Sequence, residues 1–267
     1  MNILDTIISK KRVEVAEAKQ KNSIASLESS TFFRNRTLSF KEFLLRKDKT
    51  GIIAEFKRRS PSKGVINDRS SVINVTSEYA KHGASAISVL TDKEFFGGSP
   101  DDLLQARENA IPLLRKEFII DEYQLLQAKA LGADIILLIA ACLSQNEVKS
   151  LAGVAKKIGL NVLLEIHDEQ ELTHICDDVD VVGINNRNLK TFEVDISHSI
   201  DLCNKIPGDQ LKVSESGIDD VKTVLLLKQN GFSGFLMGEK FMKEADPGKA
   251  FHDFVSQLSG IENGSVI

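Results

Sequence analysis

From Gly51 onward, short apolar runs recur along the chain, and most of the intervals between them have the residue spacing of a helix. There are eight such runs: residues 51–56, 86–91, 111–118, 134–140, 161–166, 180–184, 211–215 and 233–238. Short apolar runs bounded by turn residues are typical of buried strands. Strands that alternate with helices predict a parallel sheet in an α/β protein.

Residues that begin and end helices support this alternation. Ser144-x-x-Glu147 and Asp168-x-x-Glu171 are capping boxes directly after the fourth and fifth runs. Glycine also suits the left-handed position that closes a helix. Glycines at that position precede four of the strands: Gly83, Gly132, Gly159 and Gly231. These signals predict where helices lie between the strands.

Eight strand–helix units in about 220 residues favour a (β/α)8 TIM barrel over two open sheets. A doubly wound sheet should carry Gly-x-Gly-x-x-Gly after an early strand, and the sequence has none. Residues 1–48 differ: Ile3, Leu4 and Ile7 fall on one helical stripe, and no strand is evident. We predict one barrel domain over residues 1–267, with 1–48 a helical extension and a tail that frays from about residue 259.

Composition and charge narrow the classes of function. Apolar residues make up 42% and charged residues 27%, which is ordinary for a soluble protein with a large core. The net charge of −4 does not indicate a nucleic-acid partner. The three cysteines lie far apart, and the N-terminus lacks a signal-peptide pattern, which predicts a cytoplasmic protein. No run is long enough to span a membrane, and the five histidines lack metal-ligand spacing.

Polar side chains stand at most strand ends, where a barrel of this type carries its active site. They follow the apolar runs in chain order: Glu55 and Lys57, Lys116, Glu165, Asn185 and Arg187, Glu215, and Glu239. Side chains alternate along a strand, so the first two share one face. An acid and an amine at a buried strand end are costly unless they are paired or used.

Lys116 and Glu165 are the candidate acid and base. Lys116 shares a face with Leu114 and Phe118, so we expect loss of hydration to lower its pKa. Glu165 shares a face with Leu163, and we expect burial to raise its pKa. The alternatives are structural ion pairs, between Glu55 and Lys57 or between Glu165 and one of the two lysines.

Two glycine turns and one basic loop suit an anionic ligand. Ser216-Gly217 and Gly238-Glu239 follow the seventh and eighth strands, whose loops frequently bind phosphate in barrels. The loop after the first strand carries Lys57-Arg58-Arg59-Ser60-Pro61-Ser62-Lys63-Gly64, rich in positive charge and hydroxyls. We predict a phosphorylated substrate with this loop as a flap over it. His167 lies just before a helix cap and is expected to support the site residues or to cap the helix rather than to react.

These motifs together resemble indole-3-glycerol phosphate synthase. The resemblance covers essentially the whole chain, and its most specific part is Glu55-x-Lys57-x-x-Ser60-Pro61-Ser62 followed by Lys116-x-Phe118. It also includes Phe95-Phe96-Gly97-Gly98-Ser99, Asn185-Asn186-Arg187 and Ser214-Glu215-Ser216-Gly217. It implies a carboxy-lyase of tryptophan biosynthesis that converts 1-(2-carboxyphenylamino)-1-deoxyribulose 5-phosphate to indole-3-glycerol phosphate, with loss of CO2 and water.

The resemblance also implies roles. Lys116 is expected to be the general acid on the ketone, and Glu165 to serve proton transfers around dehydration. Lys57 is expected to hold a substrate anion or to act as a second acid, with Glu55 and Glu215 orienting the amines. Asn185 and Arg187 would position the anthranilate end. Phosphate-side and wall residues complete the implied site: Ser60, Phe118, Leu189, Ser216, Gly217, Leu236, Gly238 and Glu239.

The resemblance implies no metal or organic cofactor and no fused isomerase domain, and it leaves the oligomeric state open, with a monomer favoured. Asn188 stands where the family more often has Asp, and Glu239 where some members have Ser. A class I aldolase that uses Lys116 as its imine former is the nearest rival. A catalytically silent barrel that acts as a scaffold or sensor is the alternative from another class.

Overall fold

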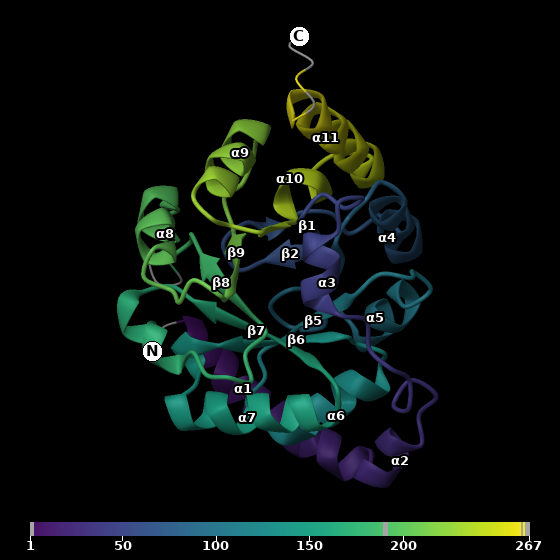
Figure 1. Ribbon diagram of the computed structural model, residues 1–267. Coiled ribbons are helices and arrows are strands. Elements are labelled where there is room, and N and C mark those ends of the chain that lie inside the picture. The colour runs from purple at the N-terminus through teal and green to yellow at the C-terminus, as the bar shows by residue number, and fades with distance from the viewer. Residues whose placement is uncertain (1–2, 189–191, 263, 265–267) are drawn as a thin grey trace.

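A closed barrel of parallel strands forms the centre of the molecule in the computed structural model, which describes residues 3–188, 192–262 and 264 (Figure 1). Its strands are β1 (Ile52–Phe56), β4 (Ala86–Leu90), β5 (Leu113–Lys116), β6 (Ile135–Ile139), β7 (Asn161–Ile166), β8 (Val181–Asn185), β9 (Leu211–Glu215) and β10 (Gly234–Met237). Neighbours in sequence pair in parallel, and β1 pairs with both β4 and β10 to close the ring. The predicted barrel is confirmed.

Helices surround this barrel and precede it. The extension holds α1 (Ile3–Lys21), α2 (Ile24–Glu28) and α3 (Phe40–Leu45). The outer helices are α4 (Val72–Lys81), α5 (Pro100–Ala106), α6 (Glu122–Ala130), α7 (Gln145–Lys157), α8 (Ile196–Cys203), α9 (Val221–Gln229), α10 (Glu239–Met242) and α11 (Pro247–Glu262). No helix in these described ranges is long and apolar enough to cross a membrane.

Local sequence signals explain several helix boundaries. Ser144 and Glu147 form the predicted reciprocal capping box at the start of α7. The four glycines expected to close helices, at positions 83, 132, 159 and 231, all have φ between 82° and 90°. Only glycine adopts that conformation without steric cost, so these positions end the helices where the sequence predicts.

Two local predictions are wrong, and the flap has a feature that the sequence does not predict. The segment after β7 forms only a 3-10 helix, η2 (Glu169–His174), in which Asp168 caps the backbone N–H of Gln170 and Glu171 accepts a bond from the backbone N–H of His167. The flap contains a hairpin of two short strands, β2 (Arg59–Ser60) and β3 (Gly64–Val65). The tail stays helical to Glu262, whose carboxylate lies 2.6 Å from the ammonium of Lys228.

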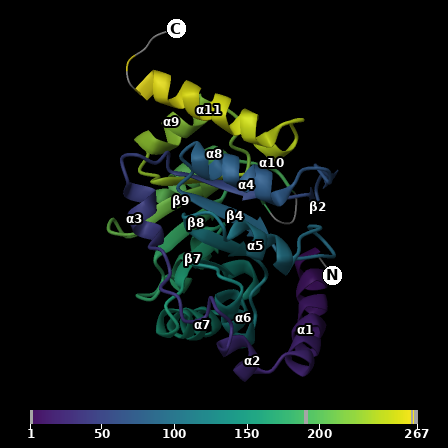
Figure 2. The same ribbon diagram turned by 90° about the vertical axis from the view of Figure 1, so that its right-hand side faces the viewer.

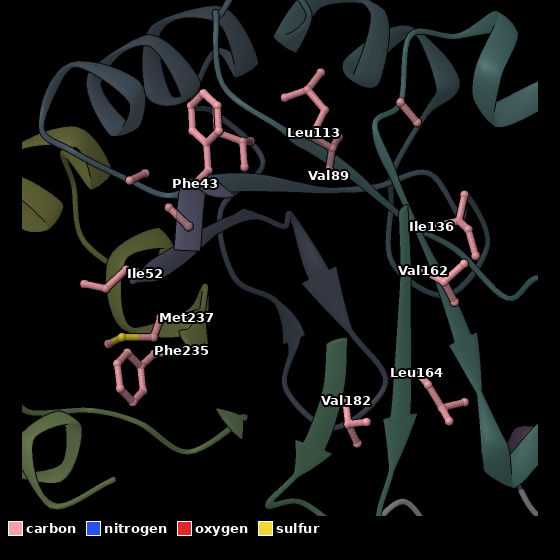
Figure 3. Close-up of a cluster of buried hydrophobic side chains, with 14 of the residues drawn as sticks. Phe43, Ile52, Val89, Leu113, Ile136, Val162, Leu164, Val182, Phe235 and Met237 are labelled. Atoms are coloured by element: carbon pink, nitrogen blue, oxygen red, sulfur yellow. The ribbon is translucent and has the colours of Figure 1, made fainter. Parts of the chain in front are cut away.

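The core has two layers separated by the strands. Side chains that point inward fill the barrel, among them Ile53, Leu114 and Leu163. Side chains that point outward pack between strands and helices, and Figure 3 shows a group of them that includes Val89, Leu113, Ile136 and Val182. Both layers are buried, so the strands read as nearly continuous apolar runs.

The extension reaches both ends of the barrel. Phe40 and Leu44 of α3 belong to the inner core, and the backbone N–H of Phe40 donates to Asn161 at the start of β7 (3.2 Å). Helix α3 therefore closes the end where the strands begin. Figure 2 shows α3 on one side of the barrel and α1 with β2 on the other. Residues Ile7, Lys11 and Val15 form the buried stripe of α1.

Candidate active site

A cavity of about 400 Å³ opens at the carboxyl ends of the strands. Side chains from all eight barrel strands or the loops after them line it, together with residues of the flap and the first turns of α1. Among the predicted site residues that the structure describes, all lie around this cavity: Glu55, Lys57, Ser60, Lys116, Phe118, Glu165, Asn185, Arg187, Glu215, Ser216, Gly217, Leu236, Gly238 and Glu239. Leu189 lies outside the described residues.

The ammonium of Lys116 lies between two carboxylates at the bottom of the cavity. Its Nζ donates to Glu165 Oε2 at 3.0 Å and to Glu215 Oε2 at 2.6 Å. Lys116 ends β5, Glu165 lies near the end of β7, and Glu215 ends β9, so barrel closure brings the three together. Of the two partners predicted for Glu165, the structure selects Lys116.

Both predicted pKa shifts are wrong in direction. Burial lowers the pKa of Lys116, but the combined attraction of Glu165, Glu215 and Glu55 outweighs burial, and the pKa is raised. Burial raises the pKa of Glu165, but Lys116 and Asn185 outweigh it, and the pKa is lowered. The sequence shows that these groups are buried; it does not show which charges face them.

Glu215 is the carboxyl group whose pKa rises, to about 7, first because of burial and then because Glu165 and Glu55 repel its charge. Its Oε1 is buried and has no hydrogen-bond partner among the described residues. This atom occupies the space where Gly183 lacks a side chain: a Cβ at that glycine would lie 2.2 Å from it. Gly183 thus makes room for Glu215 beside Lys116.

A second acid–amine pair lies at the end of β1. Lys57 Nζ is 2.6 Å from Glu55 Oε1, as predicted from their shared face. Gly238 gives Glu55 its space, because a Cβ there would lie 2.6 Å from Glu55 Oε1. The ammonium groups of Lys57 and Lys116 are thus each paired with carboxylates, those of Glu55, Glu165 and Glu215.

Asn185 and His167 fix the geometry around Glu165. The side-chain amide of Asn185 donates to Glu165 Oε1 at 3.1 Å. The Nδ1 of His167 lies 2.8 Å from the carbonyl oxygen of Asn185 and so ties the ends of β7 and β8 together. This contact agrees with the supporting role expected of His167.

The turn after β9 has an unusual backbone. Ser216 has φ of 70° and Gly217 has φ of 68°, so two consecutive residues are left-handed. For serine this conformation is strained, and such strain is common where a loop holds a ligand. The side chain of Asn186 donates to the Ser216 carbonyl at 2.6 Å and holds the turn in place. Together with Gly238, which follows the neighbouring strand β10, this turn forms the glycine-rich side of the cavity.

Glu239 connects three loops at the rim. Its carboxylate lies 3.5 Å from Lys63 of the flap and 3.8 Å from Arg187 after β8. The sequence does not predict this bridge, because its three residues are far apart in the chain. Arg187 therefore faces a carboxylate at the cavity edge.

Apolar side chains form the opposite wall. The rings of Phe118 and Phe96 lie 6.0 Å apart between centroids, and Leu137 and Ile139 continue the wall. The residues that sequence reasoning omitted from the site include Phe96, Phe192 and, from α1, Ile3, Leu4 and Ile7. Phe96 belongs to a motif already quoted, whereas the α1 stripe reads as ordinary helix packing.

No group of three or more His, Cys, Asp or Glu side chains in the described part of the chain is arranged to hold a metal ion. The arrangement offers proton donors and acceptors, an anion-binding turn and an apolar wall. That combination suits acid–base chemistry on a molecule with an aromatic end and a phosphate end.

Comparison with known proteins gives a consistent result. The family model described as indole-3-glycerol phosphate synthase matches residues 4–254. Proteins of that name from Bacteroides thetaiotaomicron and a Polaromonas species are 48% and 43% identical, over 96% and 98% of this chain and 99% of each relative. A 3-hexulose-6-phosphate synthase structure from Salmonella typhimurium has a TM-score of 0.62 at 13% identity, covering 78% of this chain and 98% of that one, which supports the fold alone.

Proposed function

The chain belongs to the indole-3-glycerol phosphate synthase family, and we propose how the residues of its cavity carry out the family's reaction. The enzyme is a carboxy-lyase of tryptophan biosynthesis, which closes the indole ring of 1-(2-carboxyphenylamino)-1-deoxyribulose 5-phosphate. One observation carries the assignment of roles: Lys116 lies between Glu165 and Glu215, with an apolar wall on one side and a glycine-rich turn on the other.

The substrate has an aromatic end and a phosphate end, and the cavity has an apolar side and a glycine-rich side that can bind them. We place the anthranilate ring against Phe118 and Leu236, with its carboxylate near Arg187 and Lys57, because cations favour carboxylate binding. The phosphate then lies at the turn of Ser216 and Gly217, where backbone N–H groups suit an anion. This orientation sets the substrate ketone near Lys116.

Condensation requires a proton on the ketone oxygen. As the ring carbon that bears the carboxylate attacks the carbonyl carbon, Lys116 donates its proton to the oxygen, which becomes a hydroxyl. Its raised pKa keeps Lys116 protonated for this step. Loss of CO2 from the same ring carbon then returns the bonding electrons to the ring.

Dehydration needs a base and an acid. Glu165, whose lowered pKa keeps it ionised, is placed to accept the proton removed as the hydroxyl leaves. An ammonium, from Lys57 or Lys116, protonates that hydroxyl, which leaves as water. Glu55 and Glu215 hold the two ammonium groups in position through the ion pairs described above.

The direct test is incubation of the purified protein with the carboxyphenylamino sugar phosphate. We expect indole fluorescence and CO2 to appear in equal amounts. If no product forms even at high enzyme concentration, the proposed reaction is refuted.

The rival aldolase reaction needs a neutral amine at Lys116 to attack a ketone. The two neighbouring carboxylates favour the charged form, which is not a nucleophile. Borohydride reduction in the presence of a keto substrate should therefore leave Lys116 unmodified. A stable covalent adduct at Lys116, found by peptide mass spectrometry, would favour the aldolase.

We further propose that the enzyme works as a monomer in the cytoplasm. Cys142, Cys176 and Cys203 are free thiols, which fits a reducing compartment. Sedimentation of the purified protein would test the oligomeric state.

A further inference from the structure

A second cluster of buried charges lies beside the active site and has no part in the mechanism above. Its centre is Lys11 of α1, a lysine with only 4% of its surface exposed. Its Nζ lies 2.9 Å from Asp92 Oδ2, 2.9 Å from Glu117 Oε1 and 2.6 Å from Glu14 Oε2. Lysine is almost never buried unless it is paired, so this position calls for an explanation.

The two buried partners of Lys11 hold the backbone of the aromatic wall. Asp92 Oδ1 accepts bonds from the backbone N–H groups of Phe95 and Phe96, at 2.7 and 3.2 Å. Glu117 Oε1 accepts one from the N–H of Phe118 at 2.9 Å. The rings of Phe96 and Phe118 pack together and line the cavity, so the carboxylates that bind Lys11 also set where this wall lies.

The cluster also ties α1 to the same wall. Lys11 follows Ile7 by one helical turn and lies on the same buried stripe. Ile3, Leu4 and Ile7 line the cavity near the flap. The ion pairs of Lys11 with Asp92 and Glu117 therefore join the apolar residues of α1 to the loops after β4 and β5.

Electrostatics makes this link sensitive to the charge on Lys11. Asp92 and Glu117 are both buried, and a buried carboxylate without a cation is unfavourable. Arg115 lies 3.8 Å from Glu117, so it compensates that carboxylate only partly. Without the charge of Lys11, the carboxylates of Asp92 and Glu117 should turn toward solvent. They would then lose their hydrogen bonds to the backbone N–H groups of the aromatic wall.

We propose that Lys11 is a positioning residue for the aromatic end of the substrate. Through Asp92 and Glu117 it fixes the positions of Phe96 and Phe118 relative to the apolar residues of α1. It does not touch the reacting atoms. The expected kinetic effect rests on the function proposed above, whereas the effect on the wall does not.

The test compares Lys11→Met with Lys10→Met, because the neighbouring Lys10 is exposed and pairs only at 3.5 Å with Glu94 on the surface. Hydrogen exchange of the amides of Phe95, Phe96 and Phe118 should speed up by about tenfold or more in Lys11→Met, since opening of their bonds becomes easier. The amide of Glu147, bonded to Ser144 at a distant helix cap, is the internal reference. Lys10→Met should match the wild type throughout.

Kinetics then separates positioning from general stability. In Lys11→Met we expect KM for the sugar phosphate to rise by about tenfold while kcat changes by less than about threefold. Inhibition by inorganic phosphate, which binds the glycine-rich side alone, should be unchanged. Lys11→Arg keeps the charge and should recover most of the KM.

Several results would overturn the proposal. Unchanged exchange at the three amides, or an equal effect of Lys10→Met, would show that Lys11 does not hold the wall. Faster exchange with an unchanged KM would limit its role to stability. If Lys11→Met does not fold, Asp92→Asn replaces it, with exchange at Phe95 and Phe96 as the readout. An inactive wild type would remove the proposed function but leave the exchange experiment valid.

Discussion

Single residues in the site are coupled by charge. Lys116 stays protonated because carboxylates face it, and the pKa values of Glu165 and Glu215 differ because their other neighbours differ: Asn185 donates to Glu165, whereas Glu55 repels the charge of Glu215. The pKa values therefore belong to the cluster as much as to each residue. Replacing one member should alter the protonation of the others.

The first prediction concerns the proposed acid and base. Lys116→Ala and Glu165→Ala should each lower kcat by at least about a hundredfold, the usual scale for loss of a general acid or base. Single-turnover measurements of indole fluorescence would isolate the chemical steps. A kcat close to that of the wild type in either variant would refute the role of that residue.

The second prediction concerns Glu215 and pH. The folded protein holds the Glu215 proton up to a pKa of about 7, against 4.5 for an ordinary Glu, so its contribution to stability is present at low pH and is lost as pH rises through this window. Between about pH 4.5 and pH 8, Glu215→Gln should gain roughly 3 kcal/mol relative to the wild type. Urea unfolding at both pH values measures this difference. Glu28→Gln, at an exposed position, should follow the wild type.

The third prediction tests the space beside Lys116. Gly183→Ala places a methyl group where Glu215 Oε1 lies, so Glu215 must move away from Lys116. We expect kcat to fall by about tenfold or more, because sub-ångström placement matters in the site. Gly208→Ala meets no atom within 4 Å and serves as the control. Equal activities for the two variants would show that Glu215 tolerates displacement.

The sequence predicts which polar residues line the cavity but not the directions of their pKa shifts. Lys57, Lys116 and Glu165 were expected at strand ends, and strand ends meet at one face of a barrel. Their pKa shifts depend on distances across the barrel, which residue order does not contain. The bridge of Glu239 to Lys63 and Arg187 escaped prediction for the same reason.

At the scale of elements, a helix or strand was predicted well where its apolar residues are regularly spaced or where capping residues mark its ends. The eight barrel strands are apolar and follow glycine or turn residues, so their positions could be read directly. Hairpin β2–β3 has only two residues in each strand and lies in a polar loop, so it carries no periodic signal. Helix α11 outlasts the predicted fraying point because buried Phe254 and Leu258 hold its last turns.

The fourth prediction concerns helix α3. Phe40 is fully buried in the inner core at the end of the barrel opposite the cavity. Phe40→Ala should lower the free energy of unfolding by about 3–5 kcal/mol, because it leaves a cavity that the neighbouring strands cannot fill. The kcat should stay within about twofold of the wild type, given the distance of the site. Leu45→Ala, at an exposed position of the same helix, should change neither quantity appreciably.

At the scale of the whole molecule, the cavity lies at the carboxyl ends of the barrel strands, and helix α3 covers the opposite end. Ligand binding at the carboxyl ends involves residues from most strands, so it should stabilise the barrel as a unit. This separation lets the substrate cavity stay open while the other end remains packed.

The fifth prediction follows from that coupling. Indole-3-glycerol phosphate at about 100 times its Kd should stabilise the folded state by about 2.7 kcal/mol and raise Tm by roughly 5–10 °C. Calorimetry with and without ligand measures the shift. Indole without the glycerol phosphate chain, which cannot reach the glycine-rich turn, should give a much smaller one. A similar shift with indole alone would contradict the placement of the phosphate.

The position of α3 has a consequence for synthesis on the ribosome. Its residues leave the exit tunnel before any strand of the barrel, yet its docking surface includes Asn161 at the start of β7 and Gly234 at the start of β10, the last strand. During translation the apolar face of α3 stays exposed until nearly the whole chain has emerged from the ribosome. The nascent chain therefore exposes Phe40 and Leu44 until late in synthesis, and chaperones that bind apolar segments should contact it there.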